Sequence, residues 1–118
     1  MSIEAFIEKL TQTPELVQFS ETINVIENHY DFTPTAFKNG NTTNAAGQNS
    51  GSCKVFSFAK LQGLSVAQTL HCFGDFYRLD VLQHPDGEDH QNIRNFIRQG
   101  WEGIIFDALA LQLKKTDN

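Results

Sequence analysis

The sequence predicts an α+β fold that is mainly helical, with about four helices and a small two-stranded β element in a single domain. Three observations support this class. The chain has 118 residues and is 40% hydrophobic, which suffices for one buried core without metal or disulfide cross-links. Most apolar residues recur every three or four positions, as in amphipathic helices. Two segments, FTPTAFK and WEGIIF, interrupt this period and favour strands.

Two helices are expected in the N-terminal quarter of the chain. Apolar residues of segment 3–10 recur at the i, i+3, i+4, i+7 spacing of one helix face, and Ser2 can cap this helix. Thr13 followed by Pro14 has the cap and first-turn pattern of a second helix, which we expect over about 14–30.

A short strand is expected over residues 32–38. Pro34 biases the preceding residue toward an extended backbone, and Phe and Thr favour strands. Asn39-Gly40 then predicts a turn.

The central part of the sequence predicts two more helices. The first begins near Cys53, after a loop rich in Asn, Gly and Ser, and ends at Gly63. The second begins at Ser65, which can form a capping box, and its apolar stripe continues to Val81 through Gly74. Gly74 therefore predicts either a bend or the close approach of a neighbouring segment.

The C-terminal part begins with the turn HPDG at 84–87. We expect Asp89 to cap a helix that ends at Gly100, with an inner face made by three apolar residues, Ile93, Phe96 and Ile97. The tail is ambiguous between strand and helix over 103–113, and we favour a strand at about 103–108.

Composition excludes several classes of function. The net charge of −5 comes entirely from residues 1–31, so the chain has an acidic region and no basic stripe. Such a surface repels phosphate backbones and anionic lipids, and we expect no nucleic-acid or membrane partner. No apolar run is long enough for a membrane span, and two cysteines in a domain of this size favour reduced intracellular thiols.

Three long motifs resemble the HopJ type III effector family. They are NAAGQNSGSCKVFSFAKL, TLHCFGDFYRLDVL and HPDGEDHQNIRNFIRQGWEGIIF, and the resemblance extends over nearly the whole chain as one HopJ-like domain. It implies that some relatives are delivered into plant cells by type III secretion. It implies no catalytic activity, because a family name is not a mechanism. We expect a bacterial cytoplasmic location, with secretion into a host cell as the alternative.

Cys53 is the candidate nucleophile, because a thiol at a helix N-terminus is drawn toward the reactive thiolate. His90 is the candidate base, with Asp89 or Asn92 beside it to orient the ring. This arrangement predicts a cysteine-dependent enzyme. The alternative, which we favour, is that Cys53 is a small buried apolar residue.

The loop before Cys53 and the helix after Asp89 together predict a ligand site. The loop does not match a P-loop, because its glycine spacing is wrong, but its amides can still cradle a small anion. On the helix, His90, Arg94 and Arg98 recur every fourth residue and predict a cationic ridge. The alternative, which we favour, is that the ridge pairs with the acidic N-terminal helices or with Asp89, as a solvated face does. The candidate ligand-binding residues are Asn44, Gly47, Asn49, Ser50, Ser52, Asn92, Arg94 and Arg98.

Acidic and histidine side chains also gather at 84–90, but their spacing fits neither a zinc helix nor a calcium loop, and we expect no metal and no cofactor. The loop and the helix depart from what packing alone requires, so we expect both to face one concave site. The preferred interpretation is a module that binds a small anion or a protein partner.

Overall fold

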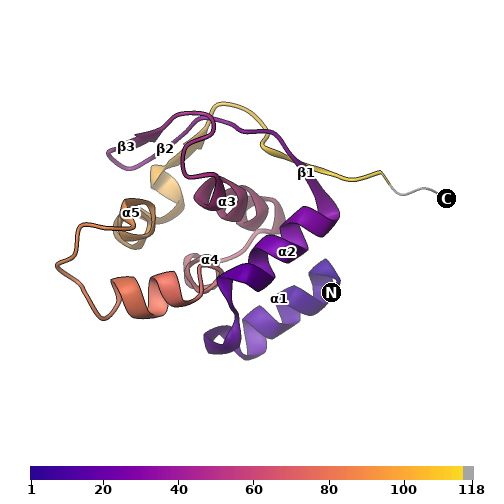
Figure 1. Ribbon diagram of the computed structural model, residues 1–118, viewed down its shortest axis with the longest axis horizontal. Coiled ribbons are helices and arrows are strands. Elements are labelled where there is room, and N and C mark those ends of the chain that lie inside the picture. Colours follow the sequence, from indigo (N-terminus) through magenta and orange to yellow (C-terminus); the bar gives the residue numbers. More distant parts are fainter. Residues whose placement is uncertain (116–118) are drawn as a thin grey trace.

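The computed structural model describes residues 1–115, and within them helix α3 is the centre of the fold (Figure 1). Its side chains are buried on most of its faces, as expected for an apolar helix with neighbours all around it. The other helices pack below and beside it in Figure 1, and the strands cross above it. The five α-helices are α1 (Ile3–Gln12), α2 (Phe19–His29), α3 (Ser50–Gln62), α4 (Val66–His71) and α5 (Gln91–Gln99).

Three shorter helical segments join these elements. A 3₁₀ turn, η1 (Pro14–Leu16), connects α1 to α2, and a second, η3 (Gly100–Gly103), follows α5. Between α4 and α5 lies a π-helix, η2 (Phe76–Val81). The prediction of one helix over 14–30 is therefore wrong. The segment forms two elements, η1 and α2, because α2 has its own N-cap residue, Gln18, which makes a capping box with Glu21.

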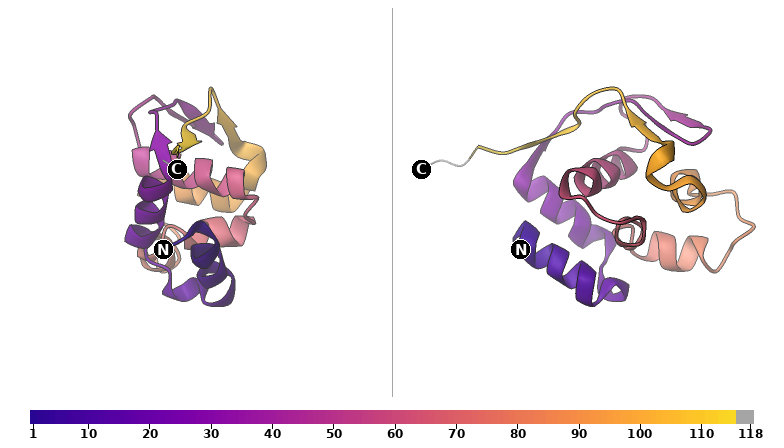
Figure 2. Two further views of the ribbon diagram at one scale, coloured as in Figure 1. Left: turned by 90° about the vertical axis from the view of Figure 1, so that its right-hand side faces the viewer. Right: turned by 180° about the vertical axis from the view of Figure 1, so that it is seen from behind.

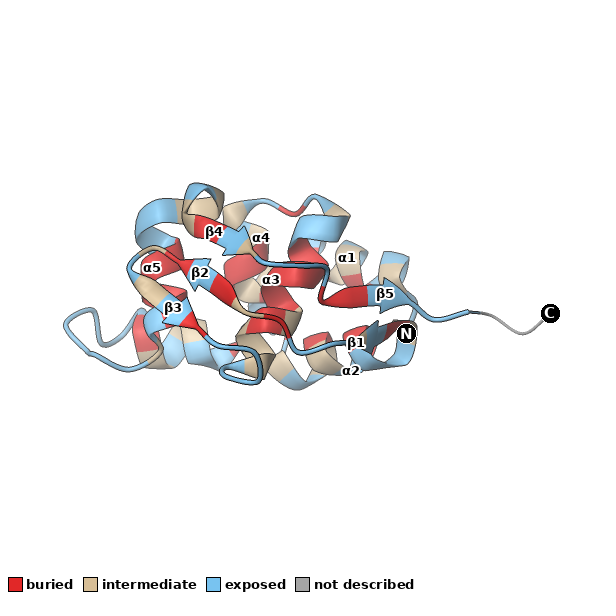
Figure 3. Ribbon diagram, turned by 90° about the horizontal axis from the view of Figure 1, so that it is seen from above, coloured by how far each residue is buried: buried red, intermediate tan, exposed pale blue. Residues whose placement is uncertain are grey.

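Five short strands form two antiparallel sheets over α3 (Figures 2 and 3). The first sheet pairs β1 (Tyr30–Phe32) with β5 (Leu111–Leu113). The second has the order β3-β2-β4, from β2 (Phe37–Asn39), β3 (Thr42–Asn44) and β4 (Ile104–Phe106). The α+β class with small strands is confirmed, and the tail after Gly103 is extended rather than helical.

The prediction of a single strand over 32–38 is wrong. Its two ends belong to different sheets, and Pro34 lies between them, where it has no N–H to donate. The predicted pairing with the tail is present at both ends, because β1 pairs with β5 and β2 with β4. The hairpin to β3, which turns at Gly40, was not predicted.

Helix ends agree with the sequence where they depend on local contacts. Gly63 ends α3 in the left-handed conformation, and the N–H of Leu64 donates to the carbonyl oxygen of Ala59 at 2.9 Å, as the Schellman motif requires.

The predicted continuous helix from Ser65 to Val81 is wrong, because the helix breaks at Gly74, where φ is +61°. A Cβ atom at Gly74 would lie 2.6 Å from the backbone nitrogen of Phe19, so a neighbouring segment does approach closely there.

Phenylalanine side chains make the centre of the core, as the composition suggested. Phe56 of α3 has no exposed surface and packs against Phe96 at 4.9 Å and Phe73 at 5.4 Å between ring centroids. The strands close the core from above, where Phe37 packs on Phe56 and on Phe106. Buried residues in Figure 3 accordingly follow α3 and the inner side of the strands.

Over residues 1–115, every helix is too short or too polar to cross a membrane.

Candidate functional site

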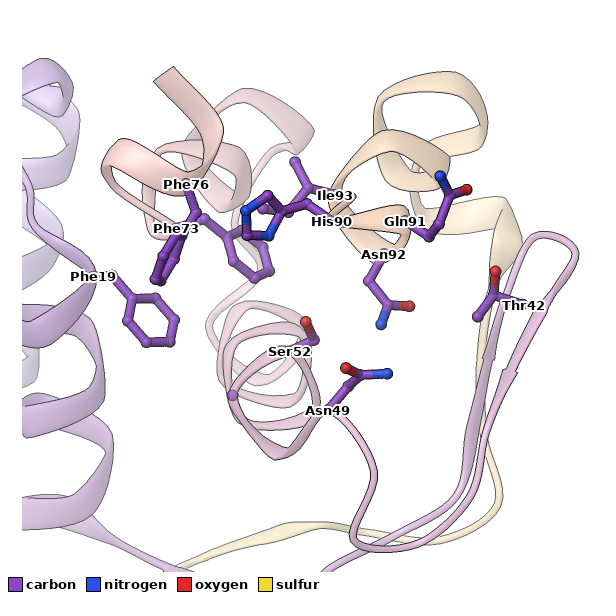
Figure 4. A pocket seen from close by; sticks show the side chains of 11 residues that line it. Phe19, Thr42, Asn49, Ser52, Phe73, Phe76, His90, Gln91, Asn92 and Ile93 are labelled. Atoms are coloured by element: carbon purple, nitrogen blue, oxygen red, sulfur yellow. The ribbon is translucent and has the colours of Figure 1, made fainter. Parts of the chain in front are cut away.

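A cavity of about 340 Å³ opens where the first turns of α3 and α5 meet (Figure 4). Its two sides differ in chemistry. One side is aromatic and is made by Phe19, Phe73 and Phe76. The other side is polar, and His90 and Ser52 lie between the two; the polar residues are Thr42, Asn49, Gln91 and Asn92. We call this space the N-terminal cavity.

Both helices begin at this cavity with the same unusual backbone geometry. Their N-cap residues, Asn49 and His90, have φ of 50° and ψ of 48°, and neither side chain caps its helix. They are the two non-glycine residues with positive φ within residues 1–115. The first intrahelical bonds are donated by Cys53 and Arg94, so the amides of the preceding turn stay available. Two positive helix ends therefore face one cavity.

Asp80 holds the His90 ring in place. Its Oδ2 lies 3.0 Å from Nε2 of His90, and the ring rests against Phe76 with 5.2 Å between centroids. In Figure 4 the second ring nitrogen, Nδ1, turns toward Ser52. Sequence reasoning missed Asp80 because its partner lies ten residues away, across the 84–87 turn. Arg78 of the same segment pairs with Asp75, three residues before it, at 3.7 Å.

A cluster of asparagines ties the β2-β3 hairpin to the starts of both helices. Asn44 and Asn92 exchange amide hydrogen bonds of 3.0 and 3.1 Å. Asn49 donates to Asn44 at 2.7 Å, and Asn39 donates to Asn92 at 3.0 Å. Because Asn39, Asn44 and Asn92 are buried, these bonds fix the polar side of the cavity rather than leaving it to solvent.

The structure brings part of the predicted ligand set together. Asn49, Ser52 and Asn92 line the cavity, and Asn44 supports them from behind. Gly47 lies in the loop before α3 and Ser50 begins α3, and neither residue lines the cavity. The loop and the start of α5 thus face one concave space; that they bind a ligand there stays a prediction.

Arg94 contradicts the cationic ridge. It is 5% exposed, and its guanidinium donates to the carbonyl oxygens of His84 at 2.8 Å and Asp89 at 2.6 Å, and to the Asp89 carboxylate at 2.7 Å. The hydrogen bond from Arg94 lowers the pKa of Asp89. The alternative, pairing with Asp89, is therefore what the structure has. Arg94 and Arg98 line a different cavity and leave His90 alone at the N-terminal cavity.

Asp89, expected as the helix cap, precedes the actual N-cap His90. It lies 3.8 Å from Nε2 of His90, farther than Asp80 does, and it is committed to Arg94. Within residues 1–115 no three side chains of the metal-binding types gather as a metal site requires.

Cys53 lies in the core rather than at the cavity. It is 1% exposed, and its thiol donates to the carbonyl oxygen of Thr35 at 3.5 Å. Burial raises the pKa of the Cys53 thiol, which opposes the effect of the helix N-terminus. Cys72 is also a buried free thiol, and burial raises its pKa to about 12. These features favour a packing role for Cys53 over a nucleophilic one.

Alkylation kinetics test that role. In the native protein we expect iodoacetamide to label Cys53 as slowly as Cys72 at neutral pH, because both thiols are buried and protonated. Both thiols should react rapidly in denaturant, and mass spectrometry of the peptides separates them. Native Cys53 reacting as fast as it does in denaturant would support the enzyme alternative instead.

Comparisons with known proteins identify the family of the chain. It matches the family described as HopJ type III effector protein over residues 3–111. It is 54% identical to a solved structure described as the unknown function protein VPA0580, with a TM-score of 0.95, over 97% of this chain and 95% of that one. No curated protein matches the chain. The family match covers most of the sequence, and the chain therefore belongs to the HopJ type III effector protein family.

Proposed function

We propose that this protein is a small-ligand-binding module and that the N-terminal cavity holds an anion. The observation that carries the proposal is the meeting of two uncapped helix N-termini at one cavity beside an imidazole. Backbone N–H groups of a first helical turn are donors for anionic oxygens, and the helix dipole adds to their attraction. The Ser52 hydroxyl and the Asn49 amide add donors from the α3 side.

The overall negative charge of the chain does not oppose this assignment. The excess acid lies in residues 1–31, and α2 contributes only Phe19 to the cavity. The two carboxylates within 4 Å of the His90 ring are already engaged, because Asp80 contacts His90 and Asp89 contacts Arg94. An anion in the cavity therefore meets donors on its polar side.

Amide chemical shifts test the proposal directly. Titration with sodium phosphate and with sodium acetate, at constant ionic strength, should shift the amides of Gly51, Ser52, Gln91 and Asn92 saturably. His90→Gln should weaken binding by about 2- to 12-fold, which corresponds to one hydrogen bond.

His84→Gln is the matched control, because His84 is exposed on the 84–87 turn and lies outside the cavity. It should leave the affinity unchanged. Shifts that are absent, or that spread over the surface without saturation, would contradict anion binding at this cavity.

We also propose a bacterial cytoplasmic location, since both cysteines are buried free thiols, as is usual in a reducing compartment. The family description includes type III secretion, which makes delivery into a host cell the alternative. Fractionation of a bacterial culture under secretion-inducing conditions distinguishes the two. Protein that stays with the cells supports the cytoplasmic location, and secretion-dependent protein in the medium contradicts it.

A further inference from the structure

Core packing explains only part of the aromatic side of the N-terminal cavity. Phe73 is buried, but Phe19 is partly exposed and Phe76 exposes 40% of its surface. The rings of Phe19 and Phe76 meet edge to face at 5.1 Å, and His90 extends the group on the other side of Phe76. A partly open aromatic group beside a cavity has room for one more ring.

The backbone around Gly74 places Phe76 on the aromatic side of the cavity. The chain breaks at Gly74, and Phe76 then begins the π-helix η2, so the residue does not follow the buried stripe of α4. Short π-helical segments in proteins are frequent at functional sites. Asp80 of the same segment orients His90, so η2 supplies both the aromatic surface and the support for the imidazole.

The aromatic and polar sides face each other across a space of ligand size. About 340 Å³ is near the lower end of the range of about 300–1,000 Å³ that small-molecule sites span. Figure 4 shows the phenyl rings on one side and the amides of Asn49 and Asn92 on the other. A ligand that satisfies both sides is amphipathic, with a flat apolar part and a charged end.

We propose that the cavity binds an aromatic oxyanion, a single ring that carries a carboxylate or phosphate group. The ring packs against Phe19 and Phe76, and the charged group lies at the first turns of α3 and α5. This inference rests on the proposed anion-binding function, and it names the ligand class. Both head groups share oxyanion chemistry, which the helix N-termini accept.

Paired ligands test the inference. Benzoate should bind more tightly than acetate, or phenyl phosphate more tightly than inorganic phosphate, by about 2- to 12-fold, the contribution of one aromatic contact. The pair with the tighter aromatic member identifies the head group. Cyclohexanecarboxylate should bind more weakly than benzoate, because its puckered ring packs less closely than a flat ring against the phenyl groups of Phe19 and Phe76.

Phe76→Ala should remove the aromatic advantage, so that in this variant benzoate binds no more tightly than acetate, or phenyl phosphate no more tightly than phosphate. The affinity ratio within each pair is the readout, because the His90 ring rests against Phe76 and the variant can change the affinity for every anion. An amide spectrum as dispersed as that of the unmodified protein shows that the variant is folded. Leu79→Ala is the control, because Leu79 is an exposed apolar residue of the same π-helix and does not line the cavity. It should change no affinity.

Three negative results are distinguishable. If acetate or phosphate shifts the cavity amides and the aromatic members bind no more tightly, the aromatic inference is wrong and anion binding stands. If cyclohexanecarboxylate equals benzoate, the aromatic assignment is also wrong. If none of the anions shifts these amides, the proposed function itself fails.

Discussion

Arg94→Ala should lower the free energy of unfolding by about 2–4 kcal/mol, because it removes a buried guanidinium that bonds several groups of one loop. The guanidinium bonds the carbonyl oxygens of His84 and Asp89 and the Asp89 carboxylate. The Arg94 side chain therefore fixes the conformation of the loop between η2 and α5. The fit is tight, since a Cβ atom at Gly87 would lie 2.5 Å from Nη2 of Arg94.

Urea unfolding monitored by the fluorescence of Trp101 measures this loss. Arg98→Ala is the matched control, because Arg98 is exposed and its guanidinium bonds only Asn95 within its own helix. We expect it to cost less than about 1 kcal/mol. Equal and small losses for the two variants would show that the Arg94 contacts contribute little.

Gly74→Ala is expected to cost about 2–4 kcal/mol as well, for a different reason. The residue has φ of +61°, where a side chain is strained, and its Cβ atom would collide with the backbone nitrogen of Phe19 at 2.6 Å. Backbone atoms cannot relieve this collision by changing rotamer, as the atoms of a side chain can. The start of α2 must therefore shift away from the break between α4 and η2.

Gly63→Ala separates strain from collision. Gly63 has a similar φ of +67°, but apart from its neighbours in the chain no atom of residues 1–115 lies within 4 Å of the position of its Cβ. We expect a loss of about 1–2 kcal/mol from the left-handed backbone alone. A Gly74 loss no larger than the Gly63 loss, in the same urea experiment, would contradict the collision. Because Phe19 also lines the aromatic side of the N-terminal cavity, Gly74→Ala should reduce the preference for the aromatic member of each anion pair, whereas Gly63→Ala should not.

The candidate site was predicted in part. The loop before α3 was recognised by its excess of turn residues. The start of α5 was predicted as a cationic ridge, which is wrong, although His90 and Asn92 do line the cavity. Both segments lie at the cavity, because a helix end needs cap and turn residues that are visible in the sequence. Asp80 and the aromatic side were not predicted as site features, since their roles depend on which segments η2 packs against.

By itself the sequence determined the α+β class, most helix positions, the stop at Gly63 and the Phe-rich core. These features follow from apolar periodicity and from caps, which act between residues a few positions apart. The tertiary structure alone decided the division of 32–38 between two sheets, the identity of the segment that approaches Gly74, which is the start of α2, and the burial of Arg94. Each of these depends on backbone groups distant in the chain or across a turn. A backbone amide or carbonyl is the same in every residue, so the sequence carries no sign of which one a side chain will meet.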